Sequence, residues 1–175
     1  MTATNNNTLA GSLPELATAH DALASAAADM GILFHIADYG GLRDEATTEQ
    51  LIAWRDQAVA AGQDYYRVAP YGHSYHDFGG AFDVRVDDDG GLADPLAVLG
   101  RLAPAAGLRW GGTFPPPADT PHFELAIDIG DLKGRWAAYQ AQPSQAGPGQ
   151  GGGAVLGVLL AAVAAYALVR GLGRR

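Results

Sequence analysis

The chain has 175 residues, 48% of them apolar, which is enough for one domain with a hydrophobic core and an appendage. Its formal net charge of −8 argues against nucleic acid as a partner, because phosphate binding needs a basic surface. It contains no cysteine, which excludes disulfides and thiolate metal ligands.

The N-terminal third is expected to hold two helices and one strand. Residues 1–12 are polar and are expected to be loose, without the basic and apolar regions of a signal peptide. Leucine and alanine recur at helical spacing over 13–30, with Ser12 as the expected N-cap. The apolar run 32–37 predicts a core strand, and 47–61 predicts a second helix after a glycine-containing turn.

A histidine and an aspartate stand seven residues apart in the segment 74–83, Ser-Tyr-His-Asp-Phe-Gly-Gly-Ala-Phe-Asp. The alternating run 81–86 predicts a strand, so His76 on the loop and Asp83 on the strand can converge on one point. Imidazole and carboxylate suit Zn²⁺ without any thiolate. Taken alone, the pair also fits a loop histidine and a strand-end carboxylate without a metal.

A second cluster follows a predicted helix over 94–106. A Trp-Gly-Gly sequence at 110–112 precedes the segment 119–125, Asp-Thr-Pro-His-Phe-Glu-Leu, whose alternation from His122 onwards predicts a half-buried strand. His122 offers a third ligand, and Asp119 lies on the loop before it. Three protein ligands leave one position for water, as in catalytic rather than structural zinc sites.

Together these motifs resemble those of the zinc peptidoglycan peptidases, which include D-alanyl-D-alanine carboxypeptidases and phage L-alanyl-D-glutamate endolysins. The pattern Ser-x-His-x-x-Gly-x-Ala-x-Asp, then Trp-Gly-Gly and Asp-x-Pro-His-Phe-Glu, carries the resemblance over the range 32–127. Its order and spacing are most similar to the endolysin branch. We therefore expect an α+β fold of the hedgehog/D,D-peptidase type, with a small antiparallel sheet flanked by helices, and hydrolysis of amide bonds in peptidoglycan stem peptides.

The resemblance implies roles for the clustered residues. It makes His76, Asp83 and His122 the ligands of Zn²⁺, which would activate a water and polarise the scissile carbonyl. It makes Asp119 the base that takes a proton from water and delivers it to the leaving amine. Glu124, on the same strand face as His122, is the alternative base.

Two further residues are expected to contact the substrate. Arg43 matches an arginine that faces the active site in the family, where it would bind a substrate carboxylate or stabilise the oxyanion. Ser74 is expected to contact the substrate as well. The alternative activities are a D,D-carboxypeptidase and a non-catalytic cell-wall-binding or virion module with the same fold. Neither a ligand nor the base is missing, which favours an enzyme.

The C-terminal part changes in composition. The peptidase domain is expected over 13–141, with a last helix over 131–142, and a Pro/Gly-rich flexible linker over 142–153 follows. The uncharged run after it predicts a transmembrane helix over 154–170, with a basic tail to 175.

This predicted helix implies a location. The arginines behind it favour a cytoplasmic C-terminus by the positive-inside rule. We therefore expect a single-pass anchor in the inner membrane, with the catalytic domain facing the periplasm or cell wall. Retention of the domain on the cytoplasmic side of the membrane is the alternative. Gly153 and Gly157 form a Gly-x-x-x-Gly pair that predicts helix-mediated self-association.

Overall fold

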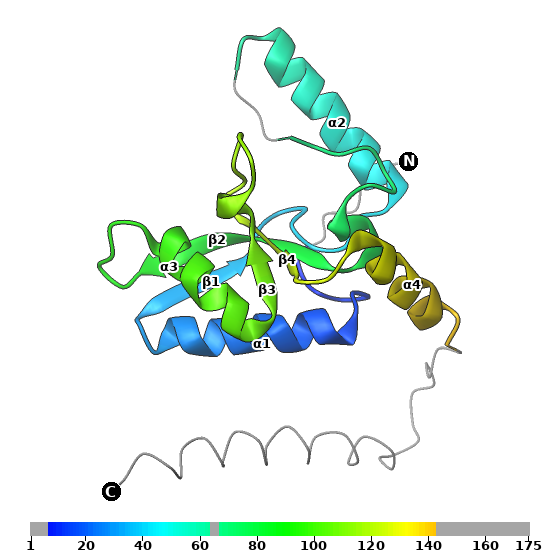
Figure 1. Cartoon of the computed structure of the whole chain (residues 1–175). Coiled ribbons are helices and arrows are strands. Elements are labelled where there is room, and N and C mark those ends of the chain that lie inside the picture. The colour runs from blue at the N-terminus through cyan, green and yellow to red at the C-terminus, as the bar shows by residue number, and fades with distance from the viewer. Residues whose placement is uncertain (1–6, 64–66, 143–175) are drawn as a thin grey trace, which may run out of the picture. The chain divides into compact units, whose positions relative to one another are not determined.

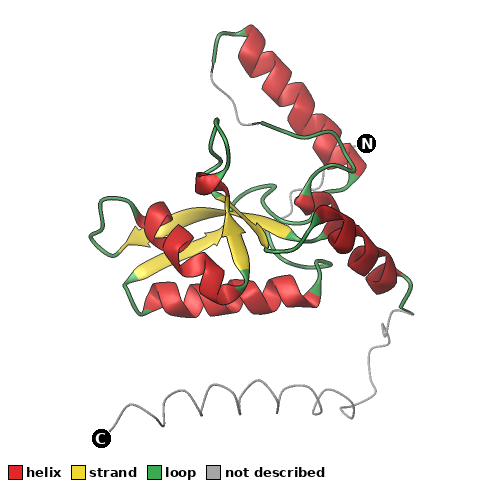
Figure 2. Cartoon of the chain, viewed as in Figure 1, coloured by secondary structure: helices red, strands yellow, loops and turns green. Residues whose placement is uncertain are grey.

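The computed structural model describes residues 7–63 and 67–142, all within one compact unit (Figures 1 and 2). In chain order, the described residues form α1 (Pro14–Ala28), β1 (Ile32–Ile36), α2 (Glu45–Ala60), the 3₁₀-helix η1 (Tyr75–Phe78), β2 (Ala81–Asp89), α3 (Pro95–Leu102), the 3₁₀-helices η2 (Ala103–Ala106) and η3 (Gly111–Thr113) on either side of β3 (Leu108–Trp110), β4 (His122–Leu125) and α4 (Ile129–Gln140).

The four strands form one antiparallel sheet in the order β1-β2-β4-β3. The long strand β2 pairs with β4 through its first residues and with β1 through the rest. This arrangement sets Asp83 directly opposite His122. The predicted α+β class, with a small antiparallel sheet and flanking helices, is confirmed.

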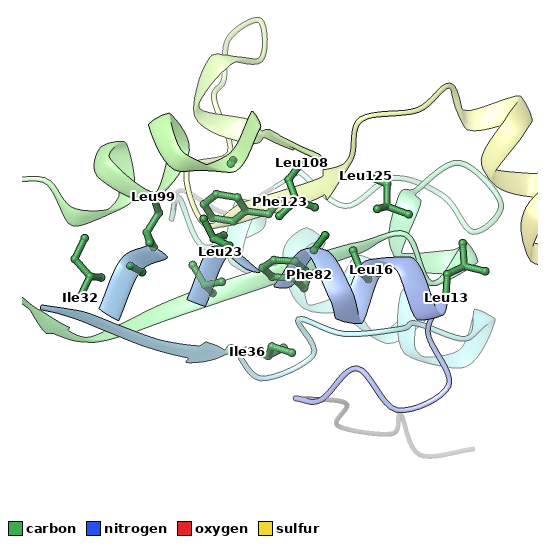
Figure 3. Close-up of a cluster of buried hydrophobic side chains, with 14 of the residues drawn as sticks. Leu13, Leu16, Leu23, Ile32, Ile36, Phe82, Leu99, Leu108, Phe123 and Leu125 are labelled. Atoms are coloured by element: carbon green, nitrogen blue, oxygen red, sulfur yellow. The ribbon is translucent and has the colours of Figure 1, made fainter. Parts of the chain in front are cut away.

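The hydrophobic core lies on one face of the sheet, where α1 packs against the strands (Figure 3). Leu16 and Leu23 of α1 are fully buried there, and the rings of Phe82 and Phe123 stack with centroids 5.7 Å apart. Because side chains alternate along a strand, the neighbours of these phenylalanines point to the opposite face. That opposite face carries Asp83 and the other side chains of the candidate site.

Helix boundaries differ from the predicted ones for identifiable reasons. The N-cap of α1 is Leu13 and not Ser12, whose hydroxyl is buried without a hydrogen-bond partner in the part of the chain described. Helix α2 starts earlier than predicted because the Asp44 side chain accepts a hydrogen bond from the Thr47 amide at 2.8 Å. The α-helical part of the segment 94–106 ends at Leu102, before a proline that cannot continue the helix.

The prediction of a transmembrane helix is wrong on the present structure. Among residues 7–63 and 67–142, no helix is long and apolar enough to cross a membrane. The longest, α2, has 16 residues, whereas a bilayer span needs about 20 apolar residues. The predicted single-pass anchor and inner-membrane location are therefore withdrawn. The predicted helix over 154–170 lies outside the described residues, as do Gly153 and Gly157, and the predicted self-association has no support.

Candidate active site

Three side chains converge at the centre of the sheet's polar face. The distances are 3.2 Å from His76 Nε2 to Asp83 Oδ1, 3.1 Å from His76 Nε2 to His122 Nδ1, and 3.0 Å from His122 Nδ1 to Asp83 Oδ1. In a tetrahedral zinc site with bonds of about 2.0–2.1 Å, neighbouring ligand atoms stand about 3.3 Å apart. The three atoms thus have the spacing of three corners of a tetrahedral metal site.

Local structure brings these residues together. The β2–β4 register places Asp83 beside His122, and His76 comes from η1 in the loop before β2. The hydroxyl of Ser74 caps η1 by accepting a hydrogen bond from the His76 amide at 3.3 Å. Gly79 ends η1 in a left-handed conformation, φ +59°, where an added Cβ would also crowd the chain at α1. Ser74 therefore holds the loop that presents His76.

In each histidine, the ring nitrogen that faces away from the cluster has a hydrogen-bond partner, and this partner determines which ring nitrogen carries the proton. His76 Nδ1 lies 3.0 Å from the Gly41 carbonyl oxygen, which only accepts hydrogen bonds, so Nδ1 carries the proton. His122 Nε2 lies 3.2 Å from the Glu124 carboxylate and donates to it in the same way. When both histidines are neutral, His76 Nε2 and His122 Nδ1 each carry a lone pair. These two lone pairs and the Asp83 carboxylate face one another. This donor set fits a bound cation, with the outer partners that metal-ligating histidines usually have.

The charges of the cluster favour the same conclusion. Burial would raise the pKa of Asp83, but His76, His122 and Arg43 hold it well below its usual range. Burial lowers the pKa of His76, and the Arg43 charge adds to this effect. Burial would also lower the pKa of His122, but its bonds to Asp83 and Glu124 raise it to about 9. Without a metal, His122 therefore tends to hold its proton beside the Asp83 carboxylate, and a bound cation would take the place of that proton.

Arg43 lines the cleft beside the cluster and contacts one of the three side chains. Its Nη2 donates to Asp83 Oδ2 at 2.6 Å, and its Nε donates to the Tyr39 carbonyl at 2.8 Å. Tyr39 adopts a left-handed conformation, φ +59°, which is uncommon for a non-glycine residue. Arg43 occupies one carboxylate oxygen of Asp83 and leaves Oδ1 facing the histidines. Its predicted contact with the substrate stays a prediction, as does that of Ser74.

Asp119 lies half-buried on the loop that leads into β4. Its amide donates to the Gly111 carbonyl at 3.0 Å, and its own carbonyl accepts from the His122 amide at 3.1 Å. A Cβ at Gly111 would overlap the Asp119 carbonyl oxygen, so only glycine allows this approach. The Trp110 indole donates to the Thr120 carbonyl at 2.7 Å and holds the same loop. The Trp-Gly-Gly sequence therefore positions the segment that carries Asp119 and His122.

The two candidate bases differ in their surroundings. Burial raises the pKa of Asp119, and the nearby Asp83 carboxylate adds to the rise. Both oxygens of Glu124 are bonded, Oε2 to His122 at 3.2 Å and Oε1 to Arg109 at 2.7 Å. Glu124 is thus an outer partner of His122, a role that sequence reasoning missed. The only signal in the sequence was its position two residues after His122 on the same strand face.

A cleft of about 730 Å³ opens over the cluster and Asp119. Tyr39 and Trp54 form part of its wall, with their rings edge-to-face and centroids 5.4 Å apart. Arg67 and Arg85 also line it. Sequence reasoning did not identify Trp54 and Arg85, which lie within regular elements that carry no motif.

The close approach at Gly111 yields a testable prediction. Gly111→Ala is expected to displace the loop of Asp119 and His122, and a shift of about 1 Å costs on the order of 10²-fold in rate. The matched control is Gly134→Ala, because a Cβ there meets nothing within 4 Å and α4 gains a better helix former. Hydrolysis rates and melting temperatures check this. An active Gly111→Ala enzyme would contradict the role given to Gly111.

The match to one family model covers the residues of this site. Residues 68–125 match a family model described as D-alanyl-D-alanine carboxypeptidase, a segment that includes all three clustered side chains and Asp119. This match confirms the family resemblance seen in the motifs and supports a peptidase. Comparison with curated proteins gives no match. The chain is also similar to the crystal structure of the Serratia marcescens L-Ala D-Glu endopeptidase ChiX, with 23% identity over 67% of this chain and 82% of that one, and a TM-score of 0.44.

Proposed function

We propose that the protein is a zinc-dependent peptidase that hydrolyses amide bonds in peptidoglycan stem peptides, with the L-alanyl-D-glutamate bond as its target. The observation that carries the proposal is the triangle of His76, Asp83 and His122 beside Asp119 in one cleft. The family match over the same residues supports a peptidase. The choice of bond rests on the order and spacing of the motifs.

The residues of the chain divide the work as follows. His76, Asp83 and His122 would hold zinc, which when bound lowers the pKa of water and polarises a carbonyl group. Asp119, whose pKa burial and Asp83 raise, is suited to carry a proton from the attacking water to the leaving nitrogen. Arg43 keeps Asp83 ionised and oriented through its bond to Oδ2.

The cleft walls suit an anionic peptide. Stem peptides carry free carboxylates, and Arg67 and Arg85 line the cleft with side chains that make no hydrogen bond or ion pair to another described residue. Arg85 follows Asp83 by two positions on β2, so its side chain leaves the same face of the strand. A guanidinium binds a carboxylate through two parallel hydrogen bonds. Arg85 is therefore placed to hold a substrate carboxylate near the cluster.

This arrangement predicts a binding effect. Arg85→Gln is expected to raise KM about tenfold for a stem peptide with free carboxylates, since a charge-assisted hydrogen bond is worth about 1.5–3 kcal/mol. The KM for the same peptide with its carboxylates converted to amides should not change. Arg101→Gln is the matched control, because Arg101 is an exposed arginine of α3 that does not line the cleft. Equal KM shifts for both peptides would contradict a carboxylate contact.

A D,D-carboxypeptidase remains the second candidate, and the description of the matching family model favours it. Mass spectrometry of purified muropeptides after digestion separates the two. An L-alanyl-D-glutamate endopeptidase cuts the stem behind its first residue, whereas a D,D-carboxypeptidase removes a single terminal alanine. Digestion that persists in a strong chelator would contradict zinc dependence. The absence of any product would favour a non-catalytic module.

A further inference from the structure

A hydrogen-bonded group of side chains beside the cluster joins the two segments that carry the histidines. Arg109 of β3 stands directly opposite Glu124 of β4 and bonds its Oε1 at 2.7 Å. The same Arg109 nitrogen donates to the Tyr75 hydroxyl at 2.7 Å, and the guanidinium lies 5.3 Å from the centroid of the Tyr75 ring. The Tyr75 hydroxyl in turn donates to the Ile127 carbonyl at 2.7 Å.

The position of these contacts in the chain is informative. Tyr75 immediately precedes His76 in η1, and Glu124 bonds the outer nitrogen of His122. One guanidinium therefore connects the side chain of the residue next to one histidine with the carboxylate that bonds the other histidine. Without Arg109, the Tyr75 hydroxyl would keep its bond to the Ile127 carbonyl, but the link from Tyr75 to the Glu124 carboxylate would be lost.

The energetics favour a role for Arg109 beyond simple surface charge. Glu124 is 6% exposed, and a buried carboxylate that loses its charged partner is costly. The Tyr75 hydroxyl uses its proton on Ile127, so it can only accept from Arg109. The planar guanidinium presents donors in a fixed geometry, which lysine cannot reproduce.

We propose that Arg109, Tyr75 and Glu124 form a bracket that fixes the spacing between His76 and His122 and so determines how tightly the cluster binds its metal. This inference rests on the proposed function for the presence of the metal. Arg109 is a positioning residue, because it acts through Glu124 and Tyr75 and touches none of the three proposed ligands.

The test is a zinc titration of the metal-free, full-length protein against a chromophoric chelator. Arg109→Gln is expected to weaken zinc binding about 10- to 100-fold, the usual effect of losing an outer-shell partner. Arg109→Lys should weaken zinc binding less than Arg109→Gln does, since lysine keeps the positive charge but lacks the planar set of donors. Tyr75→Phe deletes only one hydroxyl and should show a smaller loss. Arg101→Gln, on α3, should bind zinc like the wild type. The visible absorption of Co²⁺ bound in the site should change in the Arg109 and Tyr75 variants.

The outcomes separate this inference from the proposed function. Wild-type protein that binds no zinc would overturn both. Wild-type protein that binds zinc while Arg109→Gln and Tyr75→Phe bind it equally well would overturn the bracket alone. Melting temperatures in chelator show whether a variant folds. If Arg109→Gln fails to fold, Arg109→Lys and Tyr75→Phe decide the matter, and unchanged affinity in both overturns the inference.

Discussion

His122→Ala is expected to lose bound zinc and to reduce cell-wall hydrolysis to the level of the wild-type protein in chelator. The substitution removes one of three ligand atoms that stand 3.0 to 3.2 Å apart, and it leaves only two protein ligands. Catalytic zinc sites keep three protein ligands and one open position. Zinc content measured on the purified variant, together with the fall in turbidity of purified walls, checks this prediction.

The chain provides a matched control for this experiment. His73 lines the same cleft, but it is not one of the three clustered side chains. His73→Ala should therefore keep both zinc and most of the hydrolytic rate. A His122→Ala protein that digests walls at the wild-type rate would exclude the proposed metal centre.

Asp119→Asn should retain zinc and lose about 10²- to 10⁴-fold in rate, the usual contribution of a general base. The amide has nearly the same size as the carboxylate, and no described hydrogen bond of the fold depends on the Asp119 side chain. The measurement is the rate constant at saturating zinc, with zinc content determined on the same sample. Glu124→Gln is the comparison, and it should weaken metal binding more than it slows the reaction at saturating zinc.

The pH profile distinguishes the two carboxylates further. A general base acts in its ionised form, so the rate rises as the pH passes its pKa. Burial and the Asp83 carboxylate place the pKa of Asp119 above that of an ordinary aspartate in the metal-free protein. The acidic limb of the wild-type profile should therefore disappear in Asp119→Asn. If Asp119→Asn is active while Glu124→Gln is inactive and keeps its zinc, then Glu124 and not Asp119 is the general base.

Sequence patterns predicted three of the four strands because their signals are local, and they missed the short strand β3. Alternation over 81–86 and from His122 onwards indicated strands, and both are present, although β4 is buried at all its positions and not half-buried as predicted. The spacing of the motif residues then pointed to a cluster that the structure brings together. The family match adds support from a source independent of the coordinates.

What sequence reasoning missed depends on contacts between distant segments. The sequence around Arg109 does not indicate that it lies opposite Glu124 on the neighbouring strand. Likewise, the sequence around Arg43 does not indicate that it bonds Asp83, 40 positions away. The prediction of the α1 N-cap was wrong for a different reason. Ser12 has the residue type that favours an N-cap, yet its hydroxyl is buried and α1 starts one residue later than that cap requires. Tertiary packing overrode the local preference.

The alternation of β4 ties the integrity of the core to the chemistry of the cleft. His122 and Glu124 leave one face of that strand, while Phe123 and Leu125 leave the other and are buried in the core. A slip of one residue in its pairing would turn every side chain to the wrong side. Such a molecule would lose its hydrophobic contacts and its proposed metal ligand His122 in the same step. The amount of metal bound per chain in a refolded preparation would therefore measure the fraction of molecules whose strands have paired correctly.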